Sequence, residues 1–298
     1  MSGAPDRGAQ IDRQGRIALL DLVKNPTHEA GLAFSSLMKR MLEHSGGRLA
    51  WAGSVDQQLI GTGSETFDDI LISEFPNREA CVLALAERAA WDPEIFVSEI
   101  RSIVAAPWPT PMRWMGRAAF GLRALRGGAP PPYAPAKEDR PTFEQVELGL
   151  PEFGPTREQF EGLQGADLES RVVMVNFLEF RERARYREQE GGEQTRHAEP
   201  IEGGTDVSGR AAYGRYSANT IKIVGHLGGR IRWAGARARQ ISEGPEQSWT
   251  QVALMQYPSR AHFIGMLRDG AYQAGTPHRD AGLERTELIA CTSNAAFY

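Results

Sequence analysis

The second half of the chain carries side chains that could bind a small organic anion and move a proton on it. Guanidinium, imidazole and phenol groups around an apolar cleft suit a carboxylate, an enolate or a phenolate. Arg279 could hold such an anion while a histidine transfers the proton. We therefore predict His226, His278 and Asn176 as catalytic residues, and Tyr216, Asn219, Thr220, Tyr272 and Arg279 as substrate-binding residues.

Each of these residues also has a purely structural interpretation. Arg279 could form a surface ion pair with a neighbouring carboxylate such as Glu284, and His278 could be a solvated loop residue. His226 recurs in the first half as His44, and a histidine in the last turn of a helix interacts favourably with the helix dipole. The sequence leaves both interpretations open.

An internal repeat allows the two halves to be compared position by position. Residues 216–235 repeat residues 34–53, with serine, histidine, Gly-Gly, arginine and Trp-Ala-Gly at the same places. The offset is 182 residues, and the alignment continues without a gap to Leu85 and Leu267. A unit of about 100 residues is the usual size of a domain. We therefore predict a duplicated domain, and call its members the first and the second copy.

One predicted helix changes its chemistry between the copies. In the first copy an apolar stripe at helical spacing is formed by Phe34, Leu37, Met38, Met41 and Leu42. The corresponding residues of the second copy are Tyr216, Asn219, Thr220, Ile223 and Val224. Burying an amide or a hydroxyl without a partner costs roughly 1–3 kcal/mol. This pattern predicts a polar cleft in the second copy where the first has a packed core, unless the helix is rotated or covered by a loop.

Two further replacements point to the same asymmetry. Asn176 takes the place of Asp21 in the first strand, and Tyr272 stands where the first copy has Trp91. The segment TPHRDAG, which contains His278 and Arg279, has no counterpart in the first copy. We therefore expect any small-molecule site in the second copy.

The element order in both copies is predicted to be βαββαβ, which is the ferredoxin-like arrangement. In the first copy we expect strands at 17–23, 48–52, 67–75 and 100–105, and helices near 34–42 and 78–88. In the second copy we expect strands at 172–178, 230–234, 250–257 and 286–292, and helices at 209–227 and 260–269. The predicted domains are residues 14–106 and 167–293, joined by a linker at 107–166.

Two segments outside this pattern have alternative interpretations. Residues 112–126 carry four arginines and no acidic residue. Such a segment could be a helix that lies on a membrane surface or on a partner, or a helix that packs on its own domain. We favour packing, because fifteen residues with two glycines would bind weakly alone. The polar stretch 181–212 is either a lid over a site or disordered. Thr156 to Gln159, TREQ, predicts a capping box at the start of a short helix.

Composition excludes several classes of protein. A net charge of −4 gives no basic excess for nucleic-acid binding. The two cysteines, Cys81 and Cys291, occupy non-equivalent positions, which argues against a disulfide framework or a cysteine metal site. The sequence contains no HExxH, no glycine-rich phosphate loop and no G-x-S-x-G motif. With no signal peptide and no run of about 18 apolar residues, the expected location is cytoplasmic.

Several ordered motifs together resemble the DUF1330 family of the dimeric α+β barrel superfamily. They are VVMVNFLEF, SGRAAYGRY, GGRIRWAG, W-x-x-V-x-L-M-x-Y-P-S-R-x-x-F and AYQAGTPHRDAGLERTELI. The resemblance covers residues 171–292 well, and residues 16–106 mainly through GGRLAWAG and EFPNREA. It implies an α+β fold in which two tandem ferredoxin-like domains pair their sheets into a barrel, here within one chain.

The resemblance does not define a reaction, because fold alone does not give function. The superfamily includes cofactor-free oxygenases, isomerases, cyclases and haem enzymes. Our leading hypothesis is an enzyme without metal or nucleotide that performs proton transfer, isomerisation or oxygenation on an aromatic or enolisable small molecule. The alternatives are a non-catalytic ligand-binding or assembly protein, and a haem protein with His226 or His262 as axial ligand. A homo-oligomer is compatible with all three.

Overall fold

The computed structural model describes residues 15–25, 27–61, 67–91, 96–109, 141–147, 150–186, 204–242 and 247–294. Its elements are β1 (Ile17–Lys24), α1 (His28–Ser45), β2 (Arg48–Ile60), β3 (Asp69–Phe75), α2 (Arg78–Ala89), β4 (Glu99–Pro107), α5 (Phe143–Glu147), α6 (Arg157–Gly165), β5 (Val172–Phe180), α7 (Gly209–His226), β6 (Arg230–Gln240), β7 (Ser248–Tyr257), α8 (Arg260–Leu267), α9 (Gly270–Gly282) and β8 (Leu283–Ser293). The predicted helix 112–126 and most of the 181–212 stretch lie outside the described residues. In the described ranges, no helix is long and apolar enough to cross a membrane.

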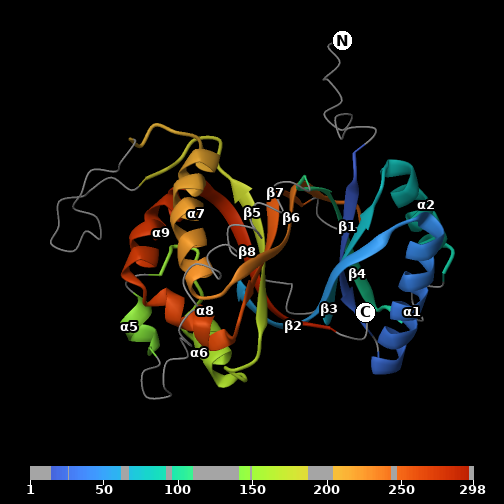
Figure 1. Ribbon diagram of the computed structural model, residues 1–298, viewed down its shortest axis with the longest axis horizontal. Coiled ribbons are helices and arrows are strands. Elements are labelled where there is room, and N and C mark those ends of the chain that lie inside the picture. The colour runs from blue at the N-terminus through green and yellow to red at the C-terminus, as the bar shows by residue number, and fades with distance from the viewer. Residues whose placement is uncertain are drawn as a thin grey trace, which may run out of the picture.

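Eight antiparallel strands close into one barrel, in the order β1-β3-β2-β8-β5-β7-β6-β4. Each copy supplies four adjacent strands, and the two sheets join where β2 pairs with β8 and β4 pairs with β6. Helices α1 and α2 cover one side of the barrel, whereas the helices of the second copy cover the opposite side (Figure 1). The predicted α+β fold, a dimeric α+β barrel closed within one chain, is confirmed.

The alternation of side chains along the strands creates three cores. On β5, Val173, Val175 and Phe177 point into the barrel, whose interior also buries Trp51 and Trp233. Val172 and Met174, on the other face of β5, belong to the layer beneath the helices of the second copy. A third cluster lies between the sheet of the first copy and its helices. Asn176 therefore lies on the helix side of β5.

Most predicted elements are confirmed; the longer strands follow from contacts between the copies, whereas α9, which the sequence did not predict, packs on α7 within the second copy. Strands β2 and β6 continue to Ile60 and Gln240, well beyond their predicted ends, because their second halves pair with a strand of the other copy. The predicted capping box is present at the start of α6, where the Thr156 side chain accepts from the Gln159 amide and the Gln159 side chain accepts from the Thr156 amide.

The described part of the predicted linker packs on the second copy. Val146 of α5 and Phe160 and Leu163 of α6 are buried in the same cluster as Tyr216 of α7. Gln57 of β2 donates a hydrogen bond to the Gln159 carbonyl of α6, at 2.8 Å. Residues 141–165 therefore close one edge of the second helix layer as well as connecting the copies.

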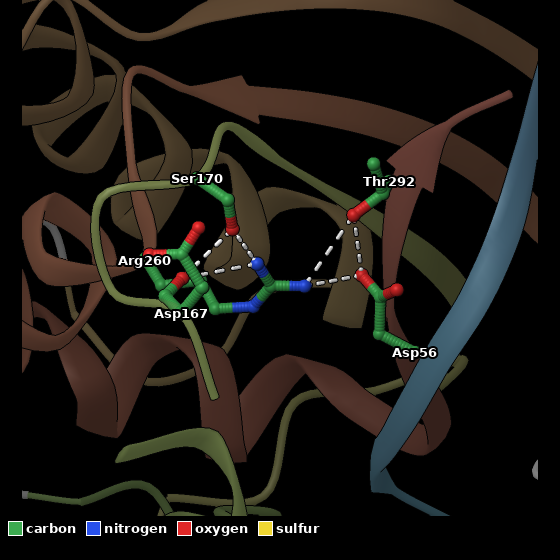
Figure 2. A network of polar contacts seen from close by, with 5 residues as sticks. All are labelled: Asp56, Asp167, Ser170, Arg260 and Thr292. Carbon is green, nitrogen blue, oxygen red and sulfur yellow. Dashed lines mark hydrogen bonds and ion pairs between the residues drawn. The ribbon is translucent and has the colours of Figure 1, made fainter. Parts of the chain in front are cut away.

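A buried arginine ties the two copies together at the β2–β8 seam. Arg260, at the start of α8, is 4% exposed and donates through Nη2 to Asp56 on β2 and, at 3.4 Å, to Thr292 on β8. Its Nη1 donates to Ser170 and to the Asp167 carbonyl, so the guanidinium bridges three segments of the chain (Figure 2). The equivalent residue of the first copy, Arg78, is exposed.

Candidate functional site

Helix α7 keeps the orientation that α1 has on its sheet. Thr220 and Val224 are buried at the positions of Met38 and Leu42, and Tyr216 is buried at the position of Phe34. Because the same helical face points inward in both copies, rotation of the helix does not explain the polar residues of α7. Thr220 faces the layer between α7 and the sheet, whereas Asn219 points toward the start of α9.

In the first copy this layer is closed by an internal ion pair. Asp21 of β1 is fully buried, and its Oδ1 accepts from Arg88 Nη1 at 2.8 Å and from Ser102 Oγ at 2.6 Å. Arg88 Nη2 also donates to Ser102 Oγ at 2.9 Å, which completes a triangle. Asp21 Oδ2 and the buried Ser73 hydroxyl have no hydrogen-bond partner among the described residues, but the buried cation of the first copy is bound by a carboxylate of the same copy.

The second copy lacks every member of that triangle. Asn176 replaces the aspartate. On the neighbouring strand, Asp21 is paired with Ser102 in the first copy, whereas Asn176 is paired with Leu288 in the second. Helix α8 ends at Leu267, the position of Leu85 in α2, so the turn that carries Arg88 has no counterpart. The chain instead continues into α9, which packs against α7 (Figure 1).

Glycines allow α9 to lie close to α7 in the antiparallel direction. A Cβ on Gly282 would meet the Gly209 carbonyl oxygen at 2.6 Å, and a Cβ on Gly275 would touch Tyr216 and Asn219 at 3.6 Å. Asp269 caps the start of α9 by accepting from the Tyr272 amide at 3.0 Å. The contacts at Gly275 and Gly282 therefore fix α9 on α7, and Arg279 lies between these two residues.

Four tyrosines line the layer beneath these helices. Tyr216 meets Tyr213 and Tyr272 with ring centroids 5.3 and 6.1 Å apart, and Tyr257 of β7 belongs to the same buried cluster. Burial raises the pKa of Tyr213, Tyr257 and Tyr272 above the ordinary phenol value. The nearby Tyr216 raises all three pKa values further. Arg279 acts in the opposite direction on the pKa of Tyr213 and of Tyr272. At neutral pH these phenols are protonated, so they are hydrogen-bond donors and not bases.

Two buried polar groups in this layer have unused hydrogen-bonding capacity. Arg279 is 5% exposed, and its Nη1 donates to the Phe153 carbonyl at 3.1 Å, with Asp280 Oδ1 at 3.8 Å. Thr220 is 8% exposed, and its Oγ1 has no hydrogen-bond partner among the described residues. A buried cation and a buried hydroxyl are thus available to a polar ligand.

His278 lies on α9 beside the stem of the long loop. Its Nδ1 is 2.9 Å from the Tyr186 hydroxyl, and the two rings meet edge to face. Arg215 of α7 donates to the same hydroxyl at 3.2 Å and to the Gly204 carbonyl at 2.7 Å. Since Arg215 can only donate, the Tyr186 proton is free to point at Nδ1, which places the proton of a neutral His278 on Nε2.

The two predicted amides have partners within the chain. Asn219 donates to the Ala271 carbonyl at 2.6 Å and so fastens α7 to the start of α9. Asn176 donates to the carbonyls of Met174 and Ala253 at 3.1 and 3.3 Å, which leaves its Oδ1 as the free end of a fixed amide. Both amides therefore help to shape the layer, and neither is a proton-transfer group.

The structure does not bring His226 to this cluster. It is the last residue of α7 and is exposed, which agrees with the interpretation as a helix terminus. His262 of α8 is half-buried, its Nδ1 lies 2.7 Å from Ser259 Oγ, and burial lowers its pKa. Neither histidine belongs to the buried cluster beneath α7, in which Tyr216, Tyr257 and Tyr272 lie. The two histidines considered as haem ligands thus lie outside that cluster, and no group of three or more described His, Cys, Asp or Glu side chains could hold a metal ion.

Sequence reasoning missed four residues of the site, namely Tyr213, Tyr257, Tyr186 and Arg215. Tyr213 precedes Tyr216 by three residues on the same helix face, so helical spacing alone could have found it. Tyr257 ends a predicted strand at a position that faces the helices. No local pattern marks Tyr186 or Arg215, because their contacts depend on where the loop stem returns.

Comparisons with known proteins agree with the resemblance seen in the sequence. The family model described as "Domain of unknown function (DUF1330)" matches residues 203–292, from just before α7 to β8. Comparison with curated proteins found no significant match. A crystal structure of a protein of unknown function from Rhodopseudomonas palustris is 28% identical over 47% of this chain and 95% of its own, with a TM-score of 0.38.

Two further solved structures are similar over nearly the whole chain. A mutant chlorite dismutase from Candidatus Nitrospira defluvii is 10% identical and covers 96% of this chain and 95% of its own, with a TM-score of 0.42. An anthrone oxidase-like protein is 10% identical and covers 93% and 91%, with a TM-score of 0.39.

Proposed function

We propose that the protein is a small-molecule enzyme whose reaction takes place in the helix layer of the second copy. The observation that carries this proposal is the contrast between the copies. In the first layer the buried arginine, Arg88, is hydrogen-bonded to Asp21, whereas in the second layer the carboxylate paired with Arg279 lies at 3.8 Å, beyond hydrogen-bond distance, and the Thr220 hydroxyl has no partner among the described residues. Perturbed and incompletely satisfied buried groups cluster at functional sites.

The reaction that these groups support best is proton transfer on an enolisable or aromatic substrate. Histidine is the side chain whose ordinary pKa suits a proton donor or acceptor near neutral pH, and His278 is the histidine that lies on α9. Protonated phenols and Arg279 would stabilise negative charge that develops on a substrate oxygen as the proton leaves. Tyr186 and Arg215 fix the orientation of the imidazole through the Tyr186 hydroxyl. Asn176 would accept a hydrogen bond through Oδ1.

Deuterium exchange tests this proposal across a whole class of candidate substrates at once. A panel of small enolisable and aromatic acids is incubated with the protein in D2O and followed by proton NMR. The wild type should replace a C–H proton of at least one compound by deuterium. His278→Gln should slow this exchange by about 100- to 10,000-fold, the usual contribution of a positioned acid or base, while binding is retained.

His226→Gln is the matched control, because that histidine is exposed and outside the layer. It should leave the exchange rate unchanged. Exchange that survives His278→Gln, or is lost in His226→Gln, would contradict the assigned roles. Compounds that bind without exchange or conversion would favour the alternative of a non-catalytic binding protein.

A further inference from the structure

Arg279 offers one particular edge of its guanidinium group to a ligand. Nη1 is taken by the Phe153 carbonyl, and Asp280 Oδ1 lies on that same side at 3.8 Å, beyond hydrogen-bond distance. Nε and Nη2 have no hydrogen-bond partner among the described residues. These two donors are parallel and match the two oxygens of a carboxylate. The free edge is therefore shaped for side-on, bidentate binding.

The position of Arg279 on α9 places this edge among aromatic rings. It lies between the two points where α9 touches α7, one at Gly275 and the other where Gly282 meets Gly209 and Tyr213. Because the helices are antiparallel, the stretch of α7 opposite Arg279 begins at Tyr213, which is only half-buried. Tyr272 lies seven residues before Arg279 on the same face of α9. A ligand held at the free edge would thus pack against phenol rings.

The charge around Arg279 suits a single negative charge. Arg181, whose backbone lies at the Gly209–Gly282 contact, pairs with Glu284 at 2.6 Å and is thereby neutralised. Asp280 already offsets part of the Arg279 charge. A doubly charged phosphate would meet one cation and a nearby carboxylate, which is unfavourable in a buried site. Because Arg279 and Asp280 carry opposite charges, a monocarboxylate adds one negative charge to the layer and such a phosphate adds two, so the monocarboxylate is the less unfavourable anion.

We propose that Arg279 is the anchor for the carboxylate of a small planar monocarboxylic acid, held side-on by Nε and Nη2 with its conjugated or aromatic body against Tyr213 and Tyr272. This inference rests on the proposed function, since it names the substrate class for the same layer. It assigns Arg279 to binding and leaves the proton transfer to His278.

Benzoate, benzamide and inorganic phosphate are suitable probes. Benzamide has nearly the shape of benzoate but no charge, and phosphate is an anion of higher charge without an aromatic ring. Each is titrated into the full chain while the arginine Nε–Hε signals are followed by NMR. Benzoate should bind and shift the Nε–Hε signal that disappears in Arg279→Lys. Benzamide and phosphate should bind at least about 10-fold more weakly, because a charged hydrogen-bonded pair contributes on the order of 10- to 100-fold in affinity.

Arg279→Lys keeps the charge and removes the fork, so benzoate affinity should fall by about 10- to 100-fold. Arg268→Met, at the exposed end of α8, is the matched control and should bind benzoate as the wild type does. Equal affinity for benzoate and benzamide in the wild type would overturn the proposal, whether or not the lysine variant folds. Unchanged benzoate affinity in a folded lysine variant would do so as well.

The outcomes separate this inference from the proposed function. If benzoate binds at Arg279 but no compound exchanges a proton in D2O, the carboxylate site stands and the enzyme assignment falls. If exchange depends on His278 but benzoate does not shift the Arg279 signal, the enzyme assignment stands and the substrate class is wrong.

Discussion

Tyr216 of α7 meets Tyr272 of α9 edge to face, with ring centroids 6.1 Å apart and planes inclined at 68°. The same contact exists in the first copy between Phe34 and Trp91, at 6.3 Å and 85°. Duplication has therefore preserved the geometry of an aromatic pair while both members of the second pair carry a hydroxyl. The two copies share the packing of aromatic rings between helices and sheet, and they differ in the polar groups that could bind a ligand there.

Thr220 and Met38 occupy equivalent positions and should respond oppositely to substitution. Thr220→Val removes a buried hydroxyl that has no partner among the described residues, so the free energy of unfolding should stay equal or rise by about 1 kcal/mol. Met38→Thr should lower it by about 2–4 kcal/mol through lost packing and an unpaired hydroxyl. Urea melts of the two variants measure both effects. Equal losses would mean that the Thr220 hydroxyl has a structural partner, such as a bound water.

The ion pair of the first copy should be sensitive to the loss of one member. Arg88→Met leaves Asp21 buried without its cation, which should cost about 3–5 kcal/mol. Combining it with Asp21→Leu removes the orphaned charge and should recover much of that loss. Thermal or urea unfolding of the single and double variants decides between this outcome and additive losses, which would show that the two side chains do not act as a pair.

Arg260 should contribute to stability far more than its repeat equivalent. Arg260→Met removes the bridge between Asp56 on β2 and the second copy and leaves Asp56, which still accepts from Thr292, without its cation, at an expected cost of about 1–3 kcal/mol. Arg78→Met, at the same position of the first copy, should change stability by less than about 0.5 kcal/mol. A comparable loss in both variants, measured by urea unfolding, would show that the loss does not arise from the seam.

Cys81 should be slow to react and should make stability fall at alkaline pH. The pKa of its thiol is raised from 9.0 to about 11. Burial is the main cause, the charge of Asp21 also raises the pKa, and that of Arg88 lowers it. Between these values the unfolded chain releases the thiol proton and the native chain keeps it, so the free energy of unfolding should decrease as the pH rises from about 9 to 11. Thiol labelling of the native protein at pH 8 should be much slower than labelling in urea, and Cys81→Ala should flatten the alkaline decrease.

The element order of both copies could be predicted because it depends on patterns that repeat in the chain, and the barrel was expected from the family resemblance. The apolar spacing around Phe34 and the repeated Gly-Gly and Trp-Ala-Gly residues fixed the element order in both copies. Helix α9 could not be predicted in this way. Gly270, Gly275, Pro277 and Gly282 disfavour a helix locally, and it is packing on α7 that overrides this preference.

The candidate site was predictable only in part, for the same reason. Tyr216, Thr220, Tyr272 and Arg279 were found because they differ from the first copy or lie in a segment that it lacks. Asp21 was visible as an acid within an apolar strand, but its partners Arg88 and Ser102 are distant in sequence and their pairing depends on the tertiary fold. His226, by contrast, was predicted partly from its repetition at His44, and in the structure both histidines lie in the last turn of equivalent helices.

Closing the barrel within one polypeptide has a consequence for how the two halves can diverge. In a ring assembled from two identical subunits every substitution occurs twice, so a residue that opens a pocket on one side also weakens the other. Here the β2–β8 and β4–β6 seams join non-identical partners. One half can keep a packed core that supports the barrel, while the other acquires polar residues for binding or catalysis. The tether also makes closure of the ring a unimolecular event, so dilution does not separate the halves as it would separate subunits.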